Sequence, residues 1–134
     1  MRVTVYLGSR CNLNCRYCHR EVEANEPMVS EKFLDELSMM EGLTIKFMGG
    51  EPTLYMDTIK KFVDRLPHAK FAVTTNGVLL DDHIEYFRKH KFFICLSYDG
   101  AGSEMRGFDP FTKLINYPWL HVSCVLYHGN TDLG

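Results

Sequence analysis

The chain has 134 residues, enough for one domain with a sizeable core and too few for two. Its net charge of -2, with both signs scattered along the chain, excludes the basic stripe that binds nucleic acid or an anionic membrane. No apolar run reaches the length of a membrane span, and strand-like sequence begins at once where a signal peptide would stand. We therefore expect a cytoplasmic protein with reduced thiols.

Short β-rich apolar runs alternate with segments of helical period along the chain. Strands are expected at 3–7, 44–48, 71–74, 92–96 and 121–127. Helices are expected to begin at Ser30, near Asp57, and at Asp81 or Asp82, and the segment 111–117 is poorly patterned. The alternation predicts an α/β fold, a partial (β/α) barrel of about five βα units forming one domain over residues 1–134.

Polar and glycine-rich clusters follow four of these strands. They are the cysteine run 11–18, Gly49-Gly50-Glu51-Pro52, Thr75-Asn76-Gly77 and Ser97-Tyr98-Asp99-Gly100. Functional groups of βα barrels gather at the carboxyl ends of the strands. The sequence therefore predicts one functional rim.

Three of the five cysteines, Cys11, Cys15 and Cys18, form a CxxxCxxC run. Thiolates are soft ligands that suit iron–sulfur clusters or zinc. One loop can wrap three corners of a [4Fe–4S] cluster and leave one iron open to a ligand from outside the protein. The alternative is a structural zinc site with His19 as fourth ligand, although such sites usually draw on two separated ligand pairs.

The cysteine run resembles the CxxxCxΦC signature of radical S-adenosylmethionine (radical SAM) enzymes, in which Φ is aromatic and here is Tyr17. The resemblance covers about residues 3–126 and implies the radical SAM type of partial barrel. It implies that Cys11, Cys15 and Cys18 bind three irons, that SAM chelates the fourth, and that Tyr17 lies near the adenine.

Three further segments resemble family motifs. Gly49-Gly50-Glu51-Pro52 is similar to the GGEP motif, which implies contacts to the SAM amino group. The TNG and S-x-D-G segments resemble those of the peptide-modifying and sulfatase-maturing branch, and Arg106 lies where relatives place an arginine for the SAM carboxylate. Each segment alone also fits an ordinary turn. The cofactor-binding residues so implied are Tyr17, Gly49, Gly50, Glu51, Thr75, Asn76, Ser97, Asp99 and Arg106.

The resemblance implies a radical SAM oxidoreductase or maturase that cleaves SAM reductively to methionine and a 5′-deoxyadenosyl radical. The expected substrate, from which the radical abstracts hydrogen, is a peptide or protein, and the electron comes from an external donor such as flavodoxin or ferredoxin. The alternatives are a small-molecule maturase, a glycyl-radical-activating enzyme, a silent radical SAM-like binding module and a zinc-binding α/β protein. The motifs identify no catalytic residue.

The sequence departs from the family at its end. The usual partial barrel has six βα units, and the sixth is missing here, which leaves an exposed parallel edge. We expect a C-terminally truncated fragment, a compact variant, or a protomer whose edge is covered in an oligomer. Cys95 and Cys124 are expected to pack in the core as small hydrophobes.

Overall fold

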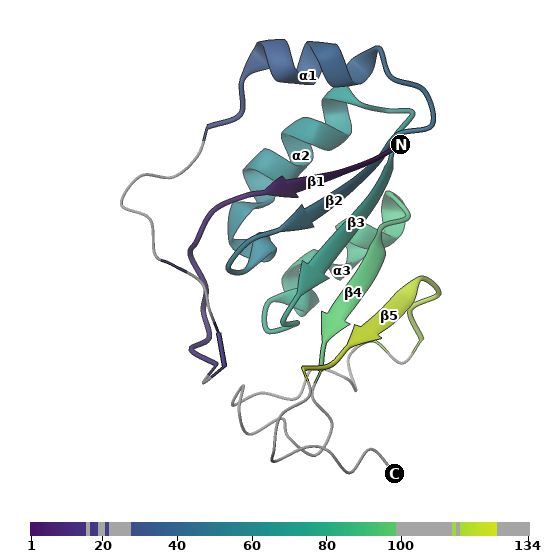
Figure 1. Ribbon diagram of the computed structural model, residues 1–134. Helices are drawn as coiled ribbons and strands as arrows, with labels where there is room; N and C mark the ends of the chain where they lie inside the picture. Colours follow the sequence, from purple (N-terminus) through teal and green to yellow (C-terminus); the bar gives the residue numbers. More distant parts are fainter. Residues whose placement is uncertain (16, 19–20, 22–27, 99–113, 115, 126–134) are drawn as a thin grey trace.

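The computed structural model describes residues 1–15, 17–18, 21, 28–98, 114 and 116–125 (Figure 1). These residues form a five-stranded sheet in the order β1-β2-β3-β4-β5, with every neighbouring pair parallel. The strands are β1 (Arg2–Tyr6), β2 (Thr44–Met48), β3 (Lys70–Thr75), β4 (Phe93–Ser97) and β5 (Leu120–Ser123). The predicted α/β fold class is confirmed, because a parallel sheet in sequential order is the start of a βα barrel.

Helical crossovers join the first four strands. They are α1 (Glu31–Ser38), the 3₁₀ turn η1 (Pro52–Tyr55), α2 (Met56–Arg65) and α3 (Leu80–Lys89). The predicted start of the first helix is confirmed, since the Ser30 side chain accepts a hydrogen bond from Phe33 N at 3.2 Å. The turn η1 was not expected from the sequence. None of the described helices is both long and apolar enough to cross a membrane.

The core lies between one face of the sheet and the helices α2 and α3, which Figure 1 shows behind the strands. Alternate strand residues point into this layer and are fully buried, among them Phe47 on β2, Val73 on β3 and Ile94 on β4. The Phe47 ring meets the Phe62 ring of α2 edge-on, with 5.3 Å between centroids. Burial of this face fixes the register of each strand.

The other face, called the open face below, carries Lys46 on β2, Ala72 and Thr74 on β3 and Cys95 on β4. These four residues are only half-buried, and no helix covers them in the part of the chain that the structure describes (Figure 1). The predicted core position of Cys95 is therefore wrong. Cys95 is not a core residue, because strand alternation turns Ile94 and Leu96 toward the helices instead.

The strand β5 forms the far edge of the sheet. It pairs with β4 from Leu120 to Ser123, and no further strand pairs with it among the described residues. Its residues are mostly exposed, as is Cys124 just beyond it, so the predicted burial of Cys124 is wrong. The predicted strand residues 126 and 127 lie outside the described residues.

Candidate functional site

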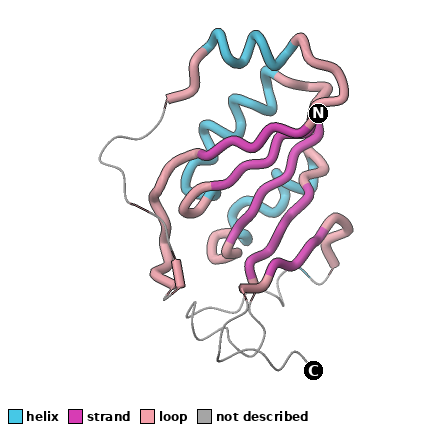
Figure 2. Tube along the Cα trace, in the orientation of Figure 1, coloured by secondary structure: helices cyan, strands magenta, loops and turns pink. Residues whose placement is uncertain are grey.

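The carboxyl ends of β1, β2, β3 and β4 lie at one end of the sheet, and Figure 2 shows the loops that follow them there. A cavity of about 160 Å³ opens among these loops. Of the twelve predicted site residues, Asp99 and Arg106 lie outside the described residues. The other ten all line this cavity: Cys11, Cys15, Tyr17, Cys18, Gly49, Gly50, Glu51, Thr75, Asn76 and Ser97. The structure therefore brings together segments more than 80 positions apart in the sequence.

The cysteine loop is held against the loop after β2 by backbone hydrogen bonds that extend the β1–β2 pairing beyond both strands. Leu7 N donates to Met48 O at 2.8 Å, Gly50 N to Gly8 O at 2.8 Å, and Glu51 N to Arg10 O at 2.7 Å. Regular pairing thus carries the chain to within one residue of Cys11, so the sheet itself positions the first thiol.

The two glycines of this loop are required by that close approach. A Cβ atom on Gly49 would stand 2.7 Å from Gly8 O, and one on Gly50 would stand 2.2 Å from Arg10 O. Both obstacles are backbone atoms, which cannot rotate away. The close approach of residues 8–10 thus gives a structural reason for both glycines.

Glu51 is the buried polar centre of the rim, with 1% of its surface exposed. Its Oε1 accepts hydrogen bonds from Thr53 N at 3.1 Å, Thr53 Oγ1 at 2.7 Å and Thr75 Oγ1 at 2.6 Å. Its Oε2 accepts one from Asn76 N at 2.8 Å. Because a buried carboxylate is costly unless its oxygens are paired, this network locks the loop after β2 to the loop after β3.

Asn76 extends the network to the cysteines. Its Nδ2 donates to Asn12 Oδ1 at 2.8 Å and lies 3.8 Å from Cys11 Sγ, while its Oδ1 accepts from Val78 N at 3.0 Å. Donors near a thiolate sulfur tune the metal centre that it ligates. Asn76 is therefore placed to orient Cys11.

Residues that sequence reasoning missed complete the site. Tyr55 of η1 accepts a hydrogen bond from Arg10 N at 2.9 Å through its hydroxyl, and the Arg10 guanidinium stacks 4.6 Å from the centre of its ring. Thr74 lines the cavity, and its Oγ1 is buried with no hydrogen-bond partner among the described residues. Strand alternation could have revealed Thr74, because adjacent threonines on a strand must face opposite sides of the sheet.

The donor set fits a thiolate-bound cofactor with a polar ligand beside it. Three thiols, all free of disulfides, line one cavity, and the Thr74 hydroxyl is left for a ligand to satisfy. Among the residues that the structure describes, no three metal-ligating side chains converge as a site for a single ion. His19, the fourth ligand of the zinc alternative, lies outside the described residues.

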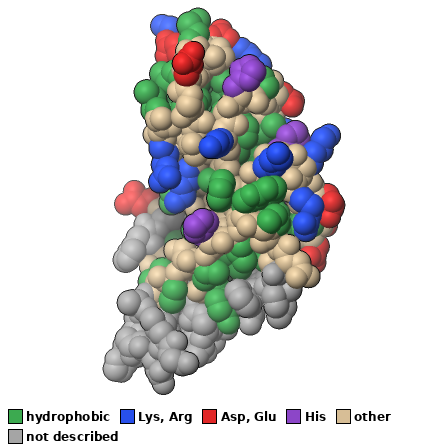
Figure 3. Space-filling view, turned by 90° about the vertical axis from the view of Figure 1, so that its right-hand side faces the viewer, with side chains coloured by type: hydrophobic (Ala, Val, Ile, Leu, Met, Phe, Trp, Pro, Cys, Tyr) green, Lys and Arg blue, Asp and Glu red, His purple; other side chains and the backbone are tan. Residues whose placement is uncertain are grey.

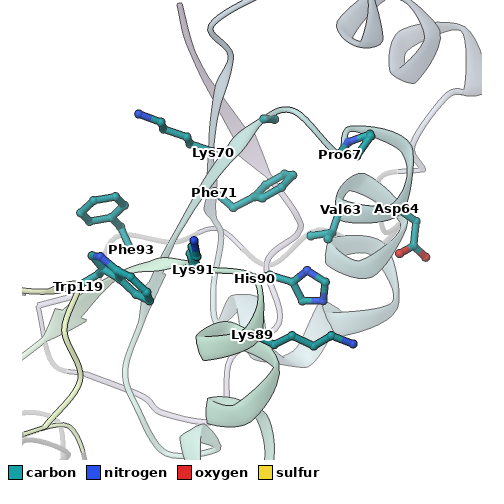
Figure 4. Close-up of a pocket in the computed structure, with 11 residues that line it drawn as sticks. Val63, Asp64, Pro67, Lys70, Phe71, Lys89, His90, Lys91, Phe93 and Trp119 are labelled. Atoms are coloured by element: carbon teal, nitrogen blue, oxygen red, sulfur yellow. The ribbon is translucent and has the colours of Figure 1, made fainter.

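A larger cavity, of about 660 Å³, lies at the opposite end of the sheet near the start of β3 and β4 (Figure 4). Its walls include Phe71, Phe93 and Trp119, with Lys89 and Lys91 at its side. It shares no residue with the site cavity, and none of the predicted site residues lines it. The motifs therefore select the smaller cavity as the functional site.

The fold and site together define a partial βα barrel with a three-cysteine cofactor loop at its carboxyl rim. The chain belongs to the Radical SAM superfamily, whose family model matches residues 5–121. The cofactors of this superfamily are a [4Fe–4S] cluster and SAM, and they are therefore the cofactors of this chain.

Individual relatives agree with this assignment. A probable GTP 3',8-cyclase of Archaeoglobus fulgidus is 33% identical over 90 residues, covering 63% of this chain and 30% of that protein. A 7-carboxy-7-deazaguanine synthase of Bacteroides thetaiotaomicron is 37% identical over 71 residues, covering 52% and 38%. The radical SAM cyclopropyl synthase TigE of Paramaledivibacter caminithermalis is 24% identical over 132 residues, covering 78% and 28%. The chain thus spans about a third of the length of these relatives.

A solved structure supports the fold. Histidine-tagged anSMEcpe with bound AdoMet superposes with a TM-score of 0.69 and 23% sequence identity, over 92% of this chain and 42% of that one. At this level of identity the likeness establishes the architecture alone.

Gly50→Ala is expected to prevent the cysteine loop from docking, because its methyl group would overlap Arg10 O. We expect the variant to lose most of its iron after anaerobic reconstitution, measured by iron analysis. The control is Gly42→Ala, which meets nothing within 4 Å and has only the cost of its φ of +62°, about 1 kcal/mol. Equal iron contents in the two variants would contradict the close-approach argument.

Glu51→Gln is expected to lower the free energy of unfolding by about 1–3 kcal/mol, because the amide NH₂ would face hydroxyl or backbone donors inside the buried network. Urea denaturation measures this change. Glu36→Gln, on the exposed surface of α1, is the matched control and is expected to change stability by less than about 0.5 kcal/mol. If both variants unfold alike, the Glu51 network does not hold the rim together.

Proposed function

We propose that this chain is the core of a radical SAM enzyme that cleaves SAM reductively and uses the product radical to abstract hydrogen from a substrate. The observation that carries the proposal is the gathering of three cysteines, none in a disulfide, and the motif residues that follow β2, β3 and β4 around one cavity. When bound, the cluster and SAM supply one-electron cleavage to methionine and a 5′-deoxyadenosyl radical.

In this proposal Cys11, Cys15 and Cys18 hold three irons of the cluster. The polar atoms left for SAM are the Thr74 hydroxyl and the Oε2 atom of Glu51, which accepts only one hydrogen bond among the described residues, while a carboxylate oxygen has two lone pairs. Tyr17, Gly49, Gly50 and Ser97 line the same cavity and complete the proposed SAM contacts.

Thr75 and Asn76 receive a different role from the one first expected. The Thr75 hydroxyl donates to Glu51 and accepts from Gly77 N, and the Asn76 side chain is engaged with Asn12 and Val78. We therefore assign both as positioning residues that hold Glu51 and the cysteine loop in place. Asp99 and Arg106 remain predictions from the motifs.

The electron is proposed to come from an external donor such as flavodoxin or ferredoxin. Cys18 is exposed, whereas Cys11 and Cys15 are half-buried. A cluster on these three residues would have one corner near the protein surface, where a donor protein could approach it. This corner is the proposed entry point for the electron.

A small molecule is the proposed substrate in place of the peptide first expected. The relatives with the higher identities are named for GTP 3',8-cyclase and 7-carboxy-7-deazaguanine synthase activities, and these names support the small-molecule alternative. The chain covers only 30% and 38% of those two proteins, so their names support a class of substrate and no particular substrate.

The test is anaerobic reconstitution with iron and sulfide, then addition of dithionite and SAM and assay of 5′-deoxyadenosine. We expect a brown protein with about four irons per chain that forms 5′-deoxyadenosine. Cys15→Ala is expected to lose both iron and product, whereas Cys124→Ala, which removes an exposed thiol outside the cavity, retains them.

Two results would contradict the proposal. A colourless protein that holds zinc would establish a structural metal site instead. A brown protein that forms no 5′-deoxyadenosine would identify a silent binding module.

A further inference from the structure

A third cavity, of about 580 Å³, lies on the open face next to the site cavity and is called the open-face cavity below. On each of three strands, a residue that lines the open-face cavity is followed, two positions on, by a residue that lines the site cavity. The pairs are Lys46 and Met48 on β2, Ala72 and Thr74 on β3, and Cys95 and Ser97 on β4. Such neighbours lie about 7 Å apart along a strand, so the two cavities continue one another.

The sizes of the site cavity and the open-face cavity indicate different roles. Ligand pockets are usually about 300–1,000 Å³. The site cavity, at about 160 Å³, is too small to hold SAM and a substrate together, whereas the adjoining cavity of about 580 Å³ is large enough for a substrate. A molecule on the open face would reach the motif residues without crossing any part of the core.

The open-face cavity is cationic. Arg2, Lys46 and Lys70 line it, and no Asp or Glu is among its described lining residues. The sheet register places Arg2 and Lys70 on either side of Thr44, two residues before Lys46 on the same strand. Their Cα atoms therefore lie within about 10 Å of one another. Figure 3, which looks at the right-hand side of Figure 1, shows Lys and Arg side chains spread around exposed hydrophobic ones on that side of the molecule.

These three cations differ from two cations of α2. Lys61 and Arg65 of α2 form ion pairs with Glu31 and Asp35 on α1. Arg2, Lys46 and Lys70 form no ion pair within the described part of the chain. Like charges held close together without a counter-charge destabilise the free protein, and they favour a ligand that carries several negative charges.

We propose that the open face binds a small-molecule substrate through a phosphate or polyphosphate group, held by Lys46, Lys70 and Arg2. The inference rests on the proposed function and names the substrate class of the same site. Lys46 is the central contact, because it is half-buried and lies nearest to the motif residues. The reacting part of the substrate would then extend about 7–10 Å from the anion toward Met48 and Thr74.

The test measures binding of inorganic tripolyphosphate to the reconstituted full chain by calorimetry at low and at raised salt. We expect binding that weakens with salt and that becomes about tenfold weaker in Lys46→Gln, as expected for one lost charge-assisted contact. Lys46→Arg keeps the charge and is expected to restore most of the affinity. Lys32→Gln, which neutralises a lysine on α1 that is 86% exposed, is the matched control and should bind as the wild type does.

A second variant tests the same prediction in case Lys46→Gln fails to fold. Lys70→Gln changes an exposed residue at the start of β3, and it is also expected to weaken tripolyphosphate binding severalfold. No binding by the wild-type protein, or equal weakening by Lys32→Gln and Lys46→Gln, would overturn the proposal. Stronger binding of an acidic peptide of equal charge would overturn it in favour of a peptide substrate.

The outcomes separate this inference from the proposed function. A protein that cleaves SAM but shows no Lys46-dependent binding of tripolyphosphate overturns the inference alone. A protein that binds tripolyphosphate through Lys46 and forms no 5′-deoxyadenosine contradicts the proposed function, and it supports the anion site independently.

Discussion

The site depends on the close approach of two backbone segments at the end of the sheet. Residues 8–10 lie against Gly49 and Gly50 so closely that a methyl group on either glycine would overlap a carbonyl oxygen. Backbone hydrogen bonds to Gly8 and Arg10 hold this arrangement, and the buried Glu51 ties it to the loop after β3. The position of the start of the cysteine loop is thus set by regular sheet pairing and one buried carboxylate.

Much of the architecture could be predicted from the sequence because it depends on local patterns. The alternation of apolar runs located all five strands, and the spacing of Cys11, Cys15 and Cys18 predicted a cofactor loop, whose three cysteines the structure places around one cavity. Contacts between distant segments have no local signature. The bond from Thr75 to Glu51 joins positions 24 apart, and the clash that requires Gly50 involves Arg10. Cys95 was misassigned because a continuous apolar run does not reveal which face of its strand is covered.

The proposed roles of the rim and the open face are cofactor binding and substrate binding, respectively. The rim holds the thiols and the atoms that could meet SAM, on loops fixed by the Glu51 network. The open face continues from the rim along β2, β3 and β4, and its cations have no acidic partners among the described residues. Substrate choice would then reside in strand residues that can vary without disturbing the cofactor loop. This division is consistent with one superfamily whose named members carry out different reactions.

The central claim is that three thiols hold a cluster with one iron left open beside a polar cavity. Electron paramagnetic resonance of the reduced, reconstituted protein, recorded before and after addition of SAM, tests it most directly. The account predicts a [4Fe–4S] signal whose shape changes when SAM is added, because SAM binds at the open iron. A cluster signal that stays unchanged at saturating SAM, or a protein without any cluster signal, would contradict the account.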